Sequence, residues 1–129
     1  MEQVDLKSPG WHVRQGQALW KPDAKKPEIV GDFLLATNPD GNSFVQFSKT
    51  FPIVTAQTNP RGWSAEFPPE NKHYAGRGMG PKRIVWLQLL RALEGSAPTG
   101  YWRVAHPSKE FIVLENEERG ERLEVHFQP

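Results

Sequence analysis

The residue types that most often carry chemistry are sparse in this chain and form no recognisable catalytic pattern. The 129 residues include no cysteine and four histidines, His12, His73, His106 and His126, which never fall at the spacing of metal ligands on a helix or hairpin. No serine lies in a Gly-x-Ser-x-Gly turn. Asp32 interrupts an apolar stretch and would be a candidate general base if buried, although a carboxylate at a sheet edge is the simpler interpretation. We therefore expect no enzyme activity, no cofactor and no metal site.

A glycine-rich segment with several basic residues is the main candidate for contact with an anion. Residues 76–83 read Gly-Arg-Gly-Met-Gly-Pro-Lys-Arg and precede a predicted helix, whose free N–H groups attract anions. The segment lacks the Lys-Ser/Thr pair of a P-loop and the acidic residue of a ribose site, so we do not expect a nucleotide. Arg77, Lys82 and Arg83 are predicted to contact anionic headgroups. The alternative is a solvated basic face.

Aromatic residues are the most informative feature, with five tryptophans and seven phenylalanines. Any one of them is most simply a core residue. Their combined ring area is large for a chain of this size, which indicates an interior that its own side chains do not fill and that accepts an acyl chain or another apolar ligand. The side chains predicted to contact such a ligand are Phe33, Leu35, Trp63, Phe67, Trp86, Leu90, Leu93 and Trp102.

The length and composition limit the fold that can hold these residues. We expect one β domain over residues 11–129, preceded by a tail over residues 1–10, because 129 residues are too few for two cores. Eleven glycines and 12 prolines favour short strands over a helix bundle. A net charge of +1 argues against a general nucleic-acid-binding protein. No apolar run reaches the length of a membrane span.

Alternating apolar residues predict about eight strands. They cover residues 11–20, 29–37, 43–49, 53–58, 63–67, 101–105, 111–116 and 121–127. Asp40-Gly41 predicts a tight hairpin after the second strand, because this pair accepts positive φ values. The second strand is apolar on both faces, so we expect both faces to be covered. Residues 68–80 are predicted to form a long loop.

One helix is predicted over residues 81–94, beginning at Pro81 and ending at Gly95. Its apolar arc is wide and leaves only a few side chains for water, among them Gln88. Such a helix must pack on a hydrophobic surface. The predicted fold is mainly β (α+β): an antiparallel curved sheet or unclosed β-barrel with one helix on its concave face. The helix is either a lid that moves when ligand enters or a permanent part of the core.

Several features along the chain resemble one known group of proteins. They are Trp11 with Gly16 and Trp20, Gly31 before Phe33-Leu34-Leu35-Ala36, residues 44–49 leading to Phe51-Pro52, Trp63, and a final hairpin over residues 114–124. In pattern and order, residues 11–127 resemble the outer-membrane lipoprotein carrier and receptor proteins of Gram-negative bacteria, the LolA/LolB-like superfamily. The resemblance implies an unclosed barrel, a hydrophobic cavity for lipoprotein acyl chains, and no catalysis. The sequence departs from that family in its single predicted helix and in its lack of a lipid-bearing cysteine.

These observations predict a non-enzymatic domain that binds lipid or acyl chains in lipoprotein trafficking or localisation at the bacterial cell envelope. Its expected partners are acyl chains or the lipid moiety of a lipoprotein, together with an anionic membrane surface, and no nucleic acid. The resemblance implies a periplasmic or outer-membrane-anchored location and requires that a signal segment was removed ahead of residue 1. A cytoplasmic location stays open. The alternative function is a module that recognises a sugar or a protein through exposed aromatic side chains.

Overall fold

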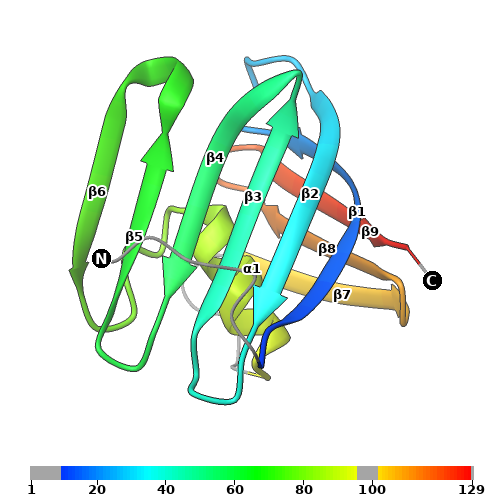
Figure 1. The fold of residues 1–129 in the computed structure, drawn as a ribbon. Helices are drawn as coiled ribbons and strands as arrows, with labels where there is room; N and C mark the ends of the chain where they lie inside the picture. The colour runs from blue at the N-terminus through cyan, green and yellow to red at the C-terminus, as the bar shows by residue number, and fades with distance from the viewer. Residues whose placement is uncertain (1–9, 96–101, 129) are drawn as a thin grey trace.

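The computed structural model describes residues 10–95 and 102–128, which form one nine-stranded antiparallel sheet and one short helix (Figure 1). The strands are β1 (His12–Lys21), β2 (Ile29–Thr37), β3 (Ser43–Lys49), β4 (Phe51–Thr58), β5 (Gly62–Phe67), β6 (Lys72–Arg77), β7 (Trp102–Ser108), β8 (Phe111–Asn116) and β9 (Glu121–Phe127). A single 3-10 turn, η1 (Pro68–Glu70), precedes β6, and the helix α1 (Val85–Leu93) follows it. The expectation of a mainly β, antiparallel, unclosed sheet with one helix is confirmed.

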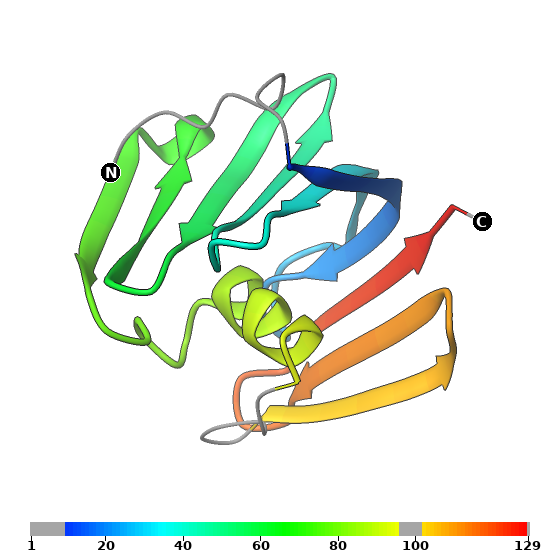
Figure 2. The ribbon, with the colours of Figure 1, turned by 60° about the horizontal axis from the view of Figure 1, so that its bottom comes forward.

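The sheet consists of two meanders, β1 to β6 and β7 to β9, which are joined by the pairing of β1 with β9. Its strand order is β6-β5-β4-β3-β2-β1-β9-β8-β7, so the pair of β1 and β9 is the only neighbouring pair that is not consecutive along the described chain. This pair runs from Gly16 opposite Phe127 to Lys21 opposite Arg122. The strands β6 and β7 form the two free edges. Figures 1 and 2 show the sheet curving around α1, with an opening between these edges.

The predicted hairpin between β2 and β3 is confirmed, and an asparagine stabilises its turn. The side-chain Oδ1 of Asn38 accepts hydrogen bonds from the backbone N–H groups of Asp40 (3.0 Å) and Asn42 (3.1 Å). Gly41 adopts a φ of 83°, which a side chain would disfavour. A local sequence signal was sufficient here because the turn is stabilised by its own residues.

Gly16 allows β1 to approach β9 closely. A Cβ atom at Gly16 would lie 1.9 Å from the carbonyl oxygen of His126 and 2.8 Å from the ring of Phe33. No other residue fits that space without a shift of the backbone. The junction between the two halves of the sheet therefore depends on a glycine.

The helix α1 lies inside the curve of the sheet, on its concave side (Figure 2). Its residues 85–90 are all buried. The ring of Trp86 stacks on Phe47 with centroids 5.0 Å apart and meets the edge of Trp20 at 5.6 Å. Aromatic pairs of this geometry add to the stability gained from burial. The helix thus fills most of the space that the curved sheet encloses.

The predicted loop over residues 68–80 is wrong, because much of it forms η1 and β6. All six residues of β6 are exposed, so the strand has no hydrophobic alternation to predict it. Its pairing with β5 over six consecutive positions makes it a strand. This is why the sheet has nine strands and not about eight.

The predicted helix start at Pro81 is also wrong. The chain makes a turn at residues 81–84, in which the N–H of Ile84 approaches the carbonyl of Pro81 (3.4 Å). Ile84 is extended, with φ −86° and ψ 101°, so the helix begins only at Val85. A proline suits a helix start but does not require one.

Two expectations about exposure are wrong as well. Gln88 is 7% exposed, although it was expected to face water, because α1 is surrounded by the curved sheet. Val30 is 49% exposed, so the outer face of β2 is not fully covered. Tyr101, with which the sixth predicted strand begins, lies outside the described residues. Within the described ranges, no helix has the length and apolar character needed to cross a membrane.

Candidate functional site

A cavity of about 460 Å³ lies beside the turn that leads into α1. Its aromatic walls come from the strands β1, β5 and β6 and from the helix: Trp20, Trp63, Phe67, Tyr74 and Trp86. Pro22, Pro81, Ile84 and Val85 add apolar surface. Its charged residues are Lys26, Glu70, Lys72, Arg83, Arg119 and Glu121. The cavity therefore combines aromatic walls with a largely cationic set of charged groups.

The glycine-rich segment positions one of these walls. A Cβ atom at Gly76 would lie 2.9 Å from Nε1 of Trp63, and one at Gly80 would lie 3.1 Å from Cγ of the same ring. The chain therefore passes closely over the Trp63 indole twice, which only glycine permits. Packing against this ring explains two of the three alternating glycines without an anion.

The turn before α1 is held by two side chains from the other half of the sheet. Nε1 of Trp102 donates a hydrogen bond to the carbonyl of Lys82 at 2.5 Å. A guanidinium nitrogen of Arg119 donates to the carbonyl of Arg83 at 2.8 Å. These bonds link the β7 and β8–β9 regions to the entrance of the helix. They fix the backbone of the turn while the side chains of Lys82 and Arg83 stay exposed.

Glu121 is the one buried carboxylate among the described residues, with 5% exposure. It accepts hydrogen bonds from Nε1 of Trp20 (2.9 Å) and from the guanidinium of Arg119. Burial raises the pKa of Glu121 from 4.5 to about 7, against the lowering effects of these two donors, and Asp23 raises it further. A substantial fraction of Glu121 is therefore protonated near neutral pH.

The remaining cations around the cavity are not neutralised by neighbours. Among the described residues, the side chains of Lys26, Lys72 and Arg83 make no ion pair. Of the described residues that line the cavity, Glu70 is the one acid besides Glu121, and it is exposed. Because Glu121 already pairs with Arg119, the charge that the cavity presents to a ligand is positive.

The structure brings only part of the predicted ligand site together. Trp63, Phe67 and Trp86 line the cavity. The other predicted ligand residues pack in or against the core, with Phe33, Leu35, Leu90 and Trp102 buried and Leu93 partly buried. They lie away from the cavity because α1 occupies the middle of the curved sheet.

The predicted anion-binding residues divide in the same way. Arg83 lines the cavity, whereas Arg77 and Lys82 are exposed elsewhere and do not. Trp20, Tyr74, Arg119 and Glu121 line it without having been predicted. Trp20 lies on the same face of β1 as the buried Gly16 and Ala18, but nothing local to the sequence indicated that Glu121 would be buried.

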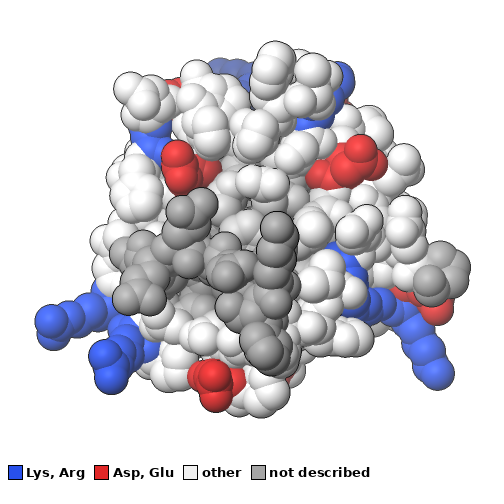
Figure 3. Space-filling model, viewed as in Figure 1, with Lys and Arg blue, Asp and Glu red and all other residues white. Residues whose placement is uncertain are grey.

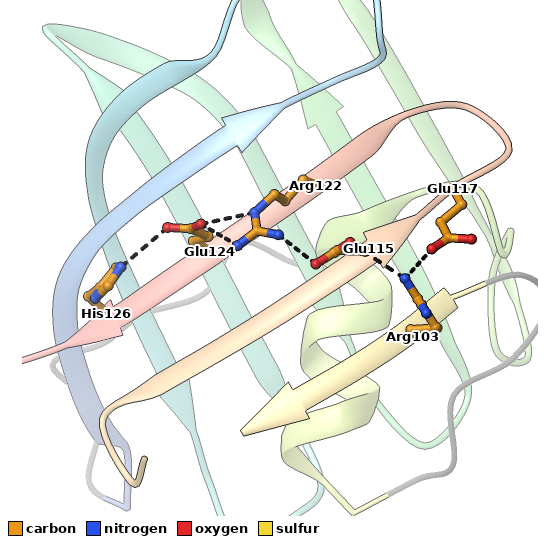
Figure 4. Close-up of polar contacts among 6 residues, drawn as sticks. All are labelled: Arg103, Glu115, Glu117, Arg122, Glu124 and His126. Carbon is orange, nitrogen blue, oxygen red and sulfur yellow. Dashed lines mark hydrogen bonds and ion pairs between the residues drawn. The ribbon is translucent and has the colours of Figure 1, made fainter. Parts of the chain in front are cut away.

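A row of ion pairs lies elsewhere, on the outer face of β7, β8 and β9 and in the turn after β8 (Figure 4). Arg122 contacts Glu115 (2.5 Å) and Glu124 (2.6 Å), which is 3.6 Å from His126. Arg103 contacts Glu117 and, at 3.9 Å, Glu115. These side chains are 21–71% exposed, and charges of opposite sign alternate along the row. Such a row keeps one face of a sheet soluble and contributes little to stability.

The geometry supports neither a general base at Asp32 nor a metal site. Asp32 is exposed, so it is not a buried general base, and the expectation of a carboxylate at a sheet edge is also wrong, because β2 is paired on both sides with β1 and β3. Within the described part of the chain, no three His, Asp or Glu residues gather where they could hold a metal ion. The cavity beside α1 is therefore the candidate site.

Comparisons with known proteins do not place this chain in a family. No protein-family model matches the chain, and no curated protein matches it. The resemblance to lipoprotein carriers accordingly remains a hypothesis from the sequence pattern, and the function has to be argued from the cavity.

Proposed function

We propose that this protein is a non-enzymatic binding domain that holds one acyl chain of an anionic amphiphile in the cavity beside α1. The observation that carries the proposal is the pairing of aromatic walls, from Trp20, Trp63 and Trp86, with unpaired cations at the same cavity. Apolar rings favour a hydrocarbon chain, and the cations favour a carboxylate or phosphate at its end.

The size of the cavity limits the ligand. About 460 Å³ lies toward the lower end of the usual range for small-molecule sites, roughly 300–1,000 Å³. One chain suits this volume better than several. The ligand would occupy the space next to residues 81–84 and not the region between the sheet and the middle of α1, where the core is filled.

The biological setting is proposed from the sequence resemblance. A domain of this kind would take part in lipoprotein trafficking or localisation at the bacterial cell envelope, in the periplasm or anchored to the outer membrane. Its ligand would then be the lipid moiety of a lipoprotein. Arg77 and Lys82, which are exposed but outside the cavity, would contact the anionic membrane surface.

The alternative, a module that recognises a sugar through exposed aromatic residues, has less support. None of the five tryptophans, all of which lie in the described ranges, is exposed. Among the described Phe, Tyr and Trp side chains only Phe51 and Tyr74 are exposed, and Tyr74 belongs to the cavity wall, so no group of exposed rings outside the cavity offers a stacking surface.

Titration with a fluorescent fatty acid such as dansyl-undecanoic acid tests the proposal. We expect saturable binding with one site per chain and energy transfer from the tryptophans that line the cavity. Phe67→Ala and Tyr74→Ala should each weaken binding several-fold, because both rings line the cavity and contact each other with centroids 6.2 Å apart. Both residues are partly accessible at the surface, so these variants should fold.

Phe51→Ala is the matched control, because Phe51 is 73% exposed and does not line the cavity. It should bind as the unaltered protein does. The proposal would be excluded if the folded protein bound no acyl probe. It would also be excluded if Phe51→Ala lowered the affinity for the probe as much as Phe67→Ala does. Retention on immobilised oligosaccharide without acyl binding would favour the sugar-binding alternative.

A further inference from the structure

The strand β6 presents an open sheet edge with neither a proline nor a bulge. It is the last strand on one side of the sheet, and its six pairs with β5 show no register shift. The opposite edge, β7, is interrupted by an irregularity between Ala105 and Ser108, a stretch that contains Pro107. Prolines and bulges at an edge prevent another strand from adding to it. The edge of β7 has both, whereas the described residues of β6 have neither.

In β6 the backbone N–H and C=O groups of every second residue point away from β5. A Cβ atom at Gly62 would lie 2.2 Å from the carbonyl oxygen of Gly76, so the backbone groups of Gly76 face β5. Neighbouring residues in an antiparallel strand direct these groups to opposite sides. The N–H and C=O groups of His73, Ala75 and Arg77 therefore point outward, and no described strand pairs with them.

The side chains along this edge are basic. The strand contains Lys72, His73 and Arg77 and no acidic residue. Arg77 lies opposite Gly62 on β5, so no side chain stands across the strand from its guanidinium, while His73 lies opposite Glu66. In the view of Figure 3, cationic side chains project from the corner that the end of β6 occupies in Figure 1.

We propose that the free edge of β6 binds an extended, acidic segment of a partner protein as an additional antiparallel strand. Main-chain hydrogen bonds to His73, Ala75 and Arg77 would supply the pairing, as in other proteins that bind a peptide by strand addition. Acidic side chains opposite Arg77 and His73 would supply the charge complementarity. These two positions are four residues apart on one face, with a residue opposite Ala75 between them.

The same geometry disfavours a second copy of this chain at the edge. Pairing of outward-facing residues would set Ala75 against its own copy and His73 against Arg77 of the copy. Because β6 carries no acid, a second copy would place no carboxylate opposite Arg77, whereas an acidic segment would. The proposal does not depend on whether the cavity binds a lipid.

The test uses short capped peptides of alternating valine and threonine with two glutamates four residues apart. We expect the amide NMR signals of His73, Ala75 and Arg77 to shift on titration and their hydrogen exchange to slow. A peptide with lysines in place of the glutamates should bind about tenfold more weakly. A glutamate peptide with N-methyl groups on the edge that faces β6 should not bind, because it cannot donate the main-chain hydrogen bonds.

Two variants separate the charge from the strand pairing. Arg77→Glu should lower the affinity for the glutamate peptide about tenfold and raise the affinity for the lysine peptide. Lys109→Glu makes the same change of charge on an exposed residue in the β7–β8 turn and should alter neither affinity. Ala75→Pro removes an outward N–H and leaves the bonds to β5, so it should abolish binding of both peptides.

Three results would overturn the proposal. They are equal affinity for the glutamate and lysine peptides, shifts confined to residues outside β6, and no binding at millimolar peptide. Dimerisation of the free protein that Ala75→Pro abolishes would assign the edge to a second copy instead.

Discussion

Glu121 illustrates how the properties of a single residue depend on contacts made across the molecule. Its carboxylate follows a turn with the sequence Glu-Glu-Arg-Gly, in which an acid would ordinarily be solvated. Here the side chain is buried against Trp20, which is 101 residues away in sequence, and beside Arg119. Burial outweighs these partners and raises the pKa of Glu121 to about 7.

The raised pKa of Glu121 predicts that stability falls as pH rises through the window from about 4.5 to about 7. In that window the folded protein binds a proton more tightly than the unfolded chain does, so raising the pH removes a stabilising proton. The difference between the two pKa values corresponds to about 3 kcal/mol or less of unfolding free energy. Urea unfolding at pH 5 and pH 7.5 measures it.

Glu121→Gln is the variant for comparison, because glutamine still accepts a hydrogen bond from Trp20 but does not titrate. Its stability should change less between the two pH values than that of the unaltered protein. Exposed Glu118→Gln serves as the control and should keep the original pH dependence. If Glu121→Gln shows the same dependence as Glu118→Gln, the buried carboxylate is not the group responsible.

At the scale of elements, the structure favours a permanent core helix over a moving lid. Six consecutive residues of α1 are buried, and Trp86 is held between Phe47 and Trp20. A moving lid would need a hinge in the glycine-rich segment over residues 68–80, yet residues 68–70 and 72–77 form η1 and β6, and two of its glycines pack on Trp63. A ligand can reach the cavity beside residues 81–84 without displacement of the helix.

Native-state hydrogen exchange should distinguish the two roles of α1. The amides of residues 89–93, which lie within the helix, should exchange only through global unfolding, with the same free energy as the central strands β2 and β3. The addition of an acyl ligand should raise all of these values together. Exchange of the helix amides well below the global free energy, with a selective response to ligand, would restore the lid.

At the scale of the whole molecule, the pairing of β1 with β9 makes the sheet continuous across the two ends of the described chain. The N–H of Gln128 donates to the carbonyl of Gln15 at 2.8 Å, so β9 ends beside the start of β1. The free edges lie instead at β6 and β7, which α1 and the segment after it connect. The order of strands in space is therefore a circular shift of their order in sequence.

A circular permutant tests this architecture. Joining residue 129 directly to residue 1 connects β9 to β1 through residues 128–129 and 1–11. New ends can be opened between Asp40 and Gly41, which are both exposed. We expect the permutant to fold with an unchanged circular dichroism spectrum and a modestly lower Tm, because every strand pair is retained.

The matched control opens the same joined chain between Leu34 and Leu35, inside β2. Because β2 pairs with strands on both sides, this cut should prevent folding. An unfolded permutant with ends at Asp40 and Gly41 would show that the β1–β9 junction needs the original chain order.

The sequence by itself determined the features that depend on neighbouring residues. The strands β2, β3, β8 and β9 have the predicted bounds, because each buries apolar side chains at successive or alternate positions between turn-forming residues. The hairpin at Asp40-Gly41 follows from the bonds of Asn38 within the turn. The mainly β class and the packing of one apolar helix on the sheet follow from the same local patterns.

Only the tertiary structure decided which residues surround the cavity. An exposed strand such as β6 leaves no hydrophobic pattern, so its existence depends on its pairing with β5. Contacts between distant segments bury Glu121, Phe33 and Leu90. Such contacts also hold the turn before α1, through the hydrogen bonds from Trp102 and Arg119. Periodicity reports which face of an element is apolar, but which surface that face meets, and where space remains, is decided when all the elements pack together.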